Sequence, residues 1–358
     1  MDVKILTWNV SFLGLAGMRR EGVRHKYYAN SVDRDNDRTS FHHTLPCSQN
    51  NQKSLCLENV HRLLTELDPG CDLICLTEPT SQLARLMKAE TRKTILRFIK
   101  NGPHEIVLLC VNSEYVIRSC RTYMLHSQKS PRPMAIVVFE RPKVVLIIVH
   151  LFHFQSSIRL LSLGLSRLIR GLDSHNVIIT GDFNTELPFP GRWDNHRTGK
   201  TCFTIVSERY RDERPMSFMY DRFVTTPSID TARVRVVERP EELLTGTFSD
   251  HLPVLGDFVV SDQGPSPDLH PGSFDVEGIR FEYVPNGVEF LSEKGPWLNF
   301  PENPGGELTV SEIAEGISGS GPPTETVSEK PFTGGYGYKH LKYKHKYLRL
   351  LRIIPQLI

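Results

Sequence analysis

The chain is divided into many short apolar runs that lie close together, and this spacing limits its fold more than any other feature. Most runs have the length of a β-strand and are bounded by residues typical of turns. Many follow one another too closely for a helix to lie between them, which excludes a wholly parallel βαβ fold. The predicted strands are Val3–Trp8, Asp72–Leu76, Ile106–Val111, Tyr115–Arg118, Ala135–Phe139, Val144–Val149, Val177–Thr180, Arg222–Val224, Ala232–Val237 and Val254–Val260.

Three longer stretches carry apolar residues at three- and four-residue spacing, which predicts amphipathic helices. They are Leu55–Leu67, Gln82–Ile99 and Ser157–Leu172. Together with the strands they predict an α/β protein in which two mixed sheets face each other and the helices lie outside. With 358 residues the chain is long enough to form such a body as one unit.

Charge divides the chain into three parts, although its net charge is only +2. We predict a folded domain over residues 1–260, which carries a net positive charge that suits a phosphorylated or polyanionic substrate. Residues 261–335 contain thirteen acidic and three basic residues, with ten prolines and twelve glycines. They are predicted to form a linker, with a hairpin near residues 278–291 through the Pro-Asn-Gly sequence.

Residues 336–358 contain six Lys or Arg and no acidic residue, and their periodicity predicts a basic amphipathic segment. Such a segment can lie on a phosphoinositide-containing or other anionic membrane surface, bind nucleic acid, dock on a partner, or pack on the folded body. Its Tyr/Lys pattern resembles short C-terminal segments in proteins of large DNA viruses. That resemblance would imply a viral protein, in the virion or the host cell.

The N-terminal sequence Met1–Lys4 has no signal-peptide pattern, and the longest apolar stretch, residues 144–154, is too short to span a bilayer. These features predict a soluble protein of the cytoplasm or nucleus. Most of the seven cysteines lie in apolar runs and are predicted to be reduced core residues. Cys47 and Cys56, near two histidines, could instead bind a metal or form a local disulfide.

Short polar motifs follow several of the predicted strands. Singly, each is compatible with an ordinary turn or strand end. The motif residues are Asn9 in "ILTWNV", Glu78 in "DLICLTE", His150 in "VHL", Asp182 and Asn184 in "VIITGDFN", Asp221 in "YDRFV", and Asp250 and His251 in "TFSDHLPV". Carboxylates and carboxamides held at strand ends are the ligands that a hard cation prefers. In combination the motifs predict a Mg²⁺ site, which Mn²⁺ could also occupy.

The same ordered motifs resemble those of the endonuclease/exonuclease/phosphatase superfamily over roughly residues 1–260. The resemblance implies a four-layer α/β/β/α sandwich with the active site at one edge of the packed sheets. It implies metal ligation by Asn9, Glu78 and Asp250, and contact with substrate through Asn9 and Arg132. One departure concerns Thr77, because the superfamily usually has Gln before the metal-binding Glu.

The resemblance also implies catalytic roles for His150, Asp182, Asn184, Asp221 and His251. Asp182 and Asn184 would position the attacking water, Asp221 would orient His251, and His150 would contact the phosphate. Whether Asp182 or His251 acts as the base stays open, because coupled groups titrate together.

The predicted function is a magnesium-dependent phosphoesterase, acting as a monomer, with nucleic acid as the first choice of substrate because the body is basic. Two other readings remain. One is a phosphoinositide phosphatase or sphingomyelinase-like phosphodiesterase, and the other is an inactive nucleic-acid-binding scaffold. The scaffold would be expected to have lost Glu78, Asp182 or His251, and the sequence keeps all three.

Overall fold

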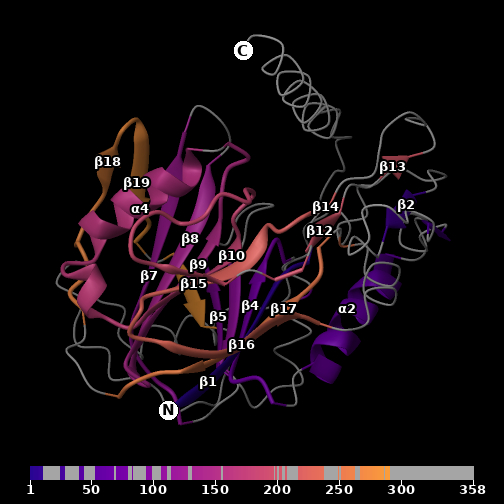
Figure 1. Cartoon of the computed structure of the whole chain (residues 1–358), viewed down its shortest axis with the longest axis horizontal. Coiled ribbons are helices and arrows are strands. Elements are labelled where there is room, and N and C mark those ends of the chain that lie inside the picture. Colours follow the sequence, from indigo (N-terminus) through magenta and orange to yellow (C-terminus); the bar gives the residue numbers. More distant parts are fainter. Residues whose placement is uncertain are drawn as a thin grey trace, which may run out of the picture. The chain divides into compact units, whose positions relative to one another are not determined.

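The computed structural model describes residues 1–10, 25–28, 40–43, 53–67, 70–79, 83, 94–98, 106–110, 114–127, 131–154, 156–196, 198–199, 201–203, 206–207, 217–237, 249, 251–262, 267–285 and 287–290. All of these lie in the first of two compact units, Met1–Asn303. Their strands form two large mixed sheets (Figure 1).

The first large sheet has seven strands in the order β16-β17-β1-β4-β6-β5-β20. In chain order they are β1 (Asp2–Asn9), β4 (Leu73–Thr77), β5 (Thr94–Phe98), β6 (Ile106–Cys110), β16 (Asp230–Val236), β17 (Val254–Val259) and β20 (Val288–Phe290). Strands β1 and β4 run parallel, and the other neighbouring pairs are antiparallel.

The second large sheet has eight strands in the order β11-β15-β10-β9-β8-β7-β19-β18. In chain order they are β7 (Val116–His126), β8 (Arg132–Arg141), β9 (Val144–His150), β10 (Val177–Asp182), β11 (Asp194–His196), β15 (Asp221–Thr225), β18 (Phe274–Val276) and β19 (Ile279–Tyr283). Here β9 and β10 are the parallel pair.

The remaining described elements are five short strands, two helices and one 3₁₀ turn. Strands β12 (Cys202–Phe203) and β14 (Ser217–Phe218) pair with each other, and β13 (Val206–Ser207), β2 (His25–Tyr28) and β3 (Ser40–His43) form a three-stranded sheet. The helices are α2 (Lys53–Leu67), α4 (Ser157–Leu168) and the 3₁₀ turn η3 (Leu172–Ser174).

The two large sheets pack face to face through one apolar layer, because alternate residues of each strand point to the same side. Ile5 and Leu73 of the first sheet share this buried cluster with Val137, Leu146 and Ile178 of the second sheet. The same alternation carries on to the strand ends, where polar residues replace the apolar ones. The alternation along each strand therefore decides which of its end residues points inward, and so which side chains meet at the edge of the sandwich.

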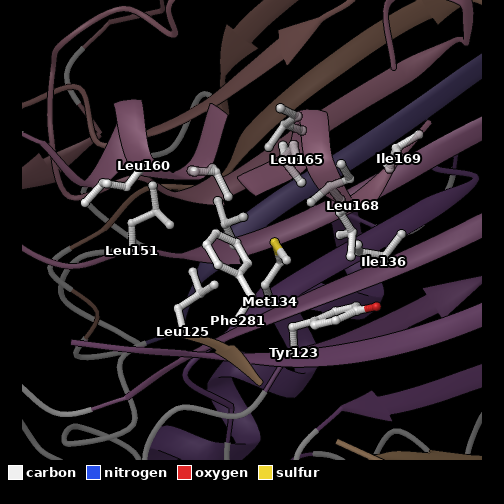
Figure 2. Close-up of a cluster of buried hydrophobic side chains, with 14 of the residues drawn as sticks. Tyr123, Leu125, Met134, Ile136, Leu151, Leu160, Leu165, Leu168, Ile169 and Phe281 are labelled. Carbon is white, nitrogen blue, oxygen red and sulfur yellow. The ribbon is translucent and has the colours of Figure 1, made fainter. Parts of the chain in front are cut away.

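Helix α4 covers the outer face of the second sheet (Figures 1 and 2). Its Leu161, Leu165 and Leu168 pack with Met134 and Ile136 in a second buried cluster. The helix approaches closely at Gly164, where an added Cβ would lie 2.0 Å from the ring of Phe281. Any larger residue at this position would therefore push the helix away from the sheet.

Helix α2 lies beside the first sheet in Figure 1 and buries Val60, Leu63 and Leu64. The outward-facing Leu6 and Ile74 of that sheet are also buried. The prediction of two packed mixed sheets with outer helices is therefore confirmed. Among the described residues, no helix is both long and apolar enough to cross a membrane.

The predicted helix Gln82–Ile99 is wrong over its C-terminal part, because Thr94–Phe98 is strand β5. This strand pairs with β6 on one side and with β20 on the other. A five-residue segment with apolar residues at mixed spacing fits either structure locally, and the sheet decides it. Most of the remainder of that predicted helix lies outside the described residues.

Residues 267–290 contribute strands to both sheets, although the composition predicts a linker there. Strands β18 and β19 form a hairpin that turns at Glu277 and Gly278, both with positive φ. This is the pattern of a tight two-residue hairpin turn. The structure differs here from the hairpin expected at Pro-Asn-Gly, because β19 pairs with β7 whereas β20 joins the other sheet.

Replacing Phe281 with Ala tests whether this segment belongs to the folded body. Phe281 is fully buried, stacks on Phe274 at 4.9 Å and contacts Gly164. We expect the free energy of unfolding, measured by urea denaturation, to fall by about 3 kcal/mol, because a large buried ring leaves a cavity. Replacing the neighbouring exposed Arg280 with Ala should change it by less than about 0.5 kcal/mol. Equal, small effects would place this segment outside the core.

Candidate active site

The predicted site residues gather at one edge of the sandwich because of the directions of the central strands. Each of the two large sheets contains one pair of parallel strands, and the carboxyl ends of these strands lie at the same edge. The residues that end or follow these strands are Asn9, Glu78, His150 and Asp182. Antiparallel partners begin at this edge, so Arg132 at the start of β8 and Asp221 at the start of β15 are brought there too.

Asn9 and Asp182 connect the two sheets across this edge. The Asn9 Nδ2 donates a hydrogen bond of 3.0 Å to Asp182 Oδ2, and both side chains are buried. The other carboxylate oxygen of Asp182 accepts the backbone N–H of Asn184 at 2.8 Å. Both oxygens of the carboxylate are thus held by described partners, which fixes its orientation.

The His150 ring lies among one cation and two carboxylates. Its Nε2 is 3.1 Å from Arg132 Nη1, 3.5 Å from Glu78 Oε1 and 3.7 Å from Asp182 Oδ2. Because a guanidinium only donates, Nε2 accepts the hydrogen bond from Arg132. Burial lowers the pKa of Arg132, while the nearby carboxylates of Glu78 and Asp182 raise it. The cluster combines opposite charges in a largely enclosed site.

Asp221 and His251 form a short, buried pair. The His251 Nδ1 lies 2.6 Å from Asp221 Oδ2, and its Nε2 lies 3.9 Å from Asp182 Oδ2. Burial raises the pKa of Asp221 to about 6, and the neighbouring His251 offsets part of that increase. The pairing fixes the imidazole so that Nε2 is directed towards Asp182.

Two non-glycine residues of the site have a left-handed backbone. Glu78 has a φ of 56° and Asn184 a φ of 51°. Asn adopts this region readily, whereas Glu does so at a cost of about 1 kcal/mol. Gly181 before Asp182 has a φ of 123°, and an added Cβ would lie 2.1 Å from the Val149 carbonyl oxygen. Strain of this kind is concentrated where the backbone must aim a functional side chain.

Several supporting residues were not predicted as part of the site. Trp8 Nε1 donates to the His251 carbonyl oxygen at 3.0 Å, and Ser249 Oγ donates to the Asn9 carbonyl oxygen at 2.5 Å. Ser249 also accepts the His251 N–H, and Thr201 Oγ1 accepts the Asp221 N–H at 3.0 Å. Trp8 and Ser249 stand beside predicted site residues, so the motifs contained that signal. No motif in the sequence marks Thr201 as part of the site.

The structure brings eight of the nine predicted site residues into one cluster, and their individual roles stay predictions. Asp250 lies outside the described residues. Thr77, at the position where the superfamily usually has Gln, is buried opposite Asn9 on the neighbouring strand. Within the described part of the chain its hydroxyl has no hydrogen-bond partner. An amide-type support for Glu78 from this position is therefore missing.

The donors at the site fit a hard divalent cation. Glu78 and Asp182 supply carboxylate oxygens that approach the same imidazole nitrogen, and Asn9 supplies a carboxamide. Such oxygen ligands suit Mg²⁺ or Mn²⁺. A second group that could hold a metal consists of Asp182, Asp221 and His251, whose ligand atoms lie within 4.8 Å of one another. The short bond between Asp221 and His251 uses one nitrogen of that imidazole.

The chain belongs to the Endonuclease/Exonuclease/phosphatase family, whose model matches residues 6–251. Members of this family are phosphoesterase hydrolases, so the class of enzyme is a hydrolase of phosphate esters. No curated protein matches the chain in sequence.

Solved structures resemble the chain at low sequence identity. A humanised TDP2 of D. rerio with 14 mutations is 13% identical, covers 72% of this chain and 99% of its own, and has a TM-score of 0.49. A functionally unknown conserved protein from Enterococcus faecalis V583 is 17% identical, with 72% and 100% covered and a TM-score of 0.49. A family protein from Bacteroides thetaiotaomicron is 14% identical, with 73% and 98% covered and a TM-score of 0.47.

Replacing His251 with Ala should destabilise the protein in a pH-dependent manner. The variant keeps the buried Asp221 carboxylate but removes the group that offsets its burial, so the pKa of Asp221 rises further above its ordinary 3.8. A raised carboxyl pKa means that the folded state binds the proton more tightly, so stability is lost as the pH rises through that pKa. We expect the free energy of unfolding to fall by about 3 kcal/mol near neutral pH.

The loss should be smaller at about pH 5, where the carboxyl group of the variant is protonated. Urea denaturation at both pH values measures this difference. The double variant His251→Ala with Asp221→Asn carries no charge at either of these two positions and should regain stability near neutral pH. An equal loss at both pH values would contradict the assigned burial of the charge.

Proposed function

We propose that the chain is a magnesium-dependent phosphodiesterase that hydrolyses nucleic acid through attack by water. The observation that carries the proposal is the convergence of the Glu78 and Asp182 carboxylates on one imidazole nitrogen, beside Arg132. A phosphodiester is anionic and resists attack by water, so its hydrolysis needs fixed positive charge and a positioned nucleophile. The cluster supplies the Arg132 charge and carboxylates that could position a water molecule.

In the proposed mechanism Asp182 orients and deprotonates the attacking water. Its two oxygens are already held by Asn9 and Asn184, so the carboxylate needs little reorganisation. The Asp221–His251 pair directs Nε2 towards the same position, where the imidazole donates a hydrogen bond to the phosphate. Arg132 donates to a phosphate oxygen from the side of His150.

Glu78, Asn9 and Asp250 would hold the metal ion, as the family resemblance implies. When bound, the ion supplies Lewis-acid stabilisation of the negative charge on the phosphate and the leaving oxygen. The partly exposed Glu78 remains within reach of solvent, as a ligand to an exchangeable Mg²⁺ requires.

Nucleic acid is the proposed substrate because of charge and sequence. Residues 1–260 carry an excess of Lys and Arg over Asp and Glu, which favours a polyphosphate backbone. The "SDHLPV" sequence resembles that of the deadenylase and nuclease branches of the superfamily. The "GDFNTELPFPGRW" sequence lacks the longer Arg- and Lys-containing signature of the inositol-phosphatase branch. Phosphoinositides and sphingomyelin are therefore the second choice.

Replacing Asp182 with Asn should lower the turnover of bis-p-nitrophenyl phosphate and of oligonucleotides by at least about a hundredfold. The amide keeps the shape and one acceptor oxygen but cannot take a proton from water. The matched control is Asp173→Asn, an exposed acid in η3, the turn that precedes the opposite end of β10. It should keep the wild-type rate.

Parallel assays on single-stranded and double-stranded DNA, RNA, phosphoinositides and sphingomyelin separate the alternatives. Turnover confined to the lipids would replace the nucleic-acid proposal by the second choice. Binding of nucleic acid without turnover of any substrate would identify an inactive scaffold. Undiminished hydrolysis by the Asp182→Asn variant would exclude the proposed role of that carboxylate.

Removal of divalent metal with EDTA should abolish hydrolysis, and added Mg²⁺ or Mn²⁺ should restore it. Replacing Glu78 with Gln removes the charged ligand and should raise the Mg²⁺ concentration for half-maximal rate by at least about tenfold. Glu140→Gln, at an exposed position near the far end of β8, serves as the control. Activity that survives EDTA, or an unchanged Mg²⁺ requirement in the Glu78 variant, would contradict the metal assignment.

A further inference from the structure

Arg222 is a buried cation directly behind the site. It follows Asp221 on β15 but points to the opposite face, because neighbouring residues of a strand alternate. Only 2% of its side chain is exposed. Apolar residues on the same side of the sheet include Val224 and Phe183. An arginine in such surroundings is costly to bury, so its contacts must offset a desolvation penalty.

The guanidinium contacts both ends of the turn that follows Asp182. Its carbon lies 4.7 Å from the centre of the Phe183 ring, which is a cation–π contact. Its Nη2 donates a hydrogen bond to the Leu187 carbonyl oxygen. One planar group thus bridges the first residue of the turn and a residue four positions later. A lysine has one point charge and cannot reproduce the stacking and the directed donor together.

The turn between these two contacts carries Asn184, whose left-handed backbone places its N–H on Asp182 Oδ1. The Asn184 side chain donates to the Leu151 carbonyl oxygen at 2.9 Å. The orientation of the Asp182 carboxylate therefore depends on how this turn is held.

Burial of the Leu187 side chain does not fix this end of the turn, although Phe189 two residues later is buried in the core. The Leu187 side chain is 42% exposed, and its backbone N–H is bound by Thr185 Oγ1 within the turn itself. Two contacts from outside the turn are described here: Arg222 donates to the Leu187 carbonyl oxygen, and the Glu186 carboxylate accepts the Met219 N–H at 3.0 Å. Of these two partners, Arg222 is a buried residue whereas Glu186 is exposed.

We propose that Arg222 is a positioning residue that fixes the Phe183–Leu187 turn and, through Asn184, the orientation of the Asp182 carboxylate. It touches neither the substrate nor the metal and acts from the opposite face of β15. Its catalytic consequence rests on the proposed function, whereas its effect on the turn can be measured without any activity. By holding the turn on both sides of Asn184, the same guanidinium also supports the left-handed backbone of that residue.

The first test is amide hydrogen exchange in the Arg222→Met variant. Met keeps the length and apolar stem but cannot donate, so the amides of Asn184 and Leu187 should exchange at least about tenfold faster. Amides of the central strands β9 and β10 should exchange as in the wild type. Arg222→Lys, which keeps a charge and a donor, should give a smaller increase. Unchanged exchange at both turn amides would overturn the proposal, whether or not the protein is an enzyme.

The second test is kinetic. Arg222→Met should lower kcat by about tenfold to a hundredfold, with KM changed by less than about threefold, because a misplaced carboxylate affects the reacting geometry. When combined with Asn184→Ala, the loss should stay within about threefold of the larger single effect, because both changes release the same turn. Independent, multiplying losses would show that Arg222 does not act through Asn184.

The matched control is Val224→Ala, a buried residue on the same strand and face. It should lower the free energy of unfolding through lost packing while leaving kcat and the exchange of the turn amides unchanged. If Val224→Ala lowered kcat as much as Arg222→Met at equal loss of stability, Arg222 would be purely structural. Absence of hydrolysis by the wild-type protein would refute the proposed function alone, since the exchange result still decides the positioning role.

Discussion

The hydrogen bond between Asn9 and Asp182 is the interaction on which the site depends, because it joins the two sheets at the edge where polar residues end their apolar inner faces. A bond to a buried carboxylate contributes about 1.5–3 kcal/mol, and leaving the carboxylate without it would cost more. The bond also places one residue from each parallel pair in direct contact. Strand direction brings the groups to the edge, and this bond fixes their separation.

The polar cluster at the edge is costly to maintain. The pKa of the buried Asp221 is raised, Glu78 has a left-handed backbone, and the Arg132 guanidinium is enclosed. Two of these costs are offset by specific partners: His251 for Asp221, and the facing carboxylates for Arg132. Burial in the two apolar layers of the fold supplies the remaining stabilising free energy. Because both oxygens of Asp182 are held and His251 is paired with Asp221, the geometry of these groups is set by the fold itself.

The positions of several site residues were predictable from the sequence, because a polar residue that directly ends an apolar run lies at the carboxyl end of the strand. Asn9, His150 and Asp182 could be placed in this way, since each directly ends an apolar run. Strand β5 could not, because its five residues take their conformation from β6 and β20 rather than from local preference. Arg222 and Thr201 were missed for a similar reason: their partners are far away in sequence and appear only when the chain is folded.

The sheets are also connected at their lateral edges, and this restricts their sliding. On one side the chain passes from β19 in the second sheet to β20 in the first. Thr122 holds this connection, because its carbonyl oxygen accepts the Val284 N–H and its hydroxyl donates to the Gly287 carbonyl oxygen. On the other side His196 Nε2 lies 2.8 Å from Thr225 Oγ1 and 3.2 Å from Thr231 Oγ1, hydroxyls that belong to different sheets. Burial lowers the pKa of His196, which favours the neutral ring that these hydroxyls can share. Displacement of one sheet along the other would stretch both connections together with the bond between Asn9 and Asp182, so the lateral edges hold the edge with the candidate site in register.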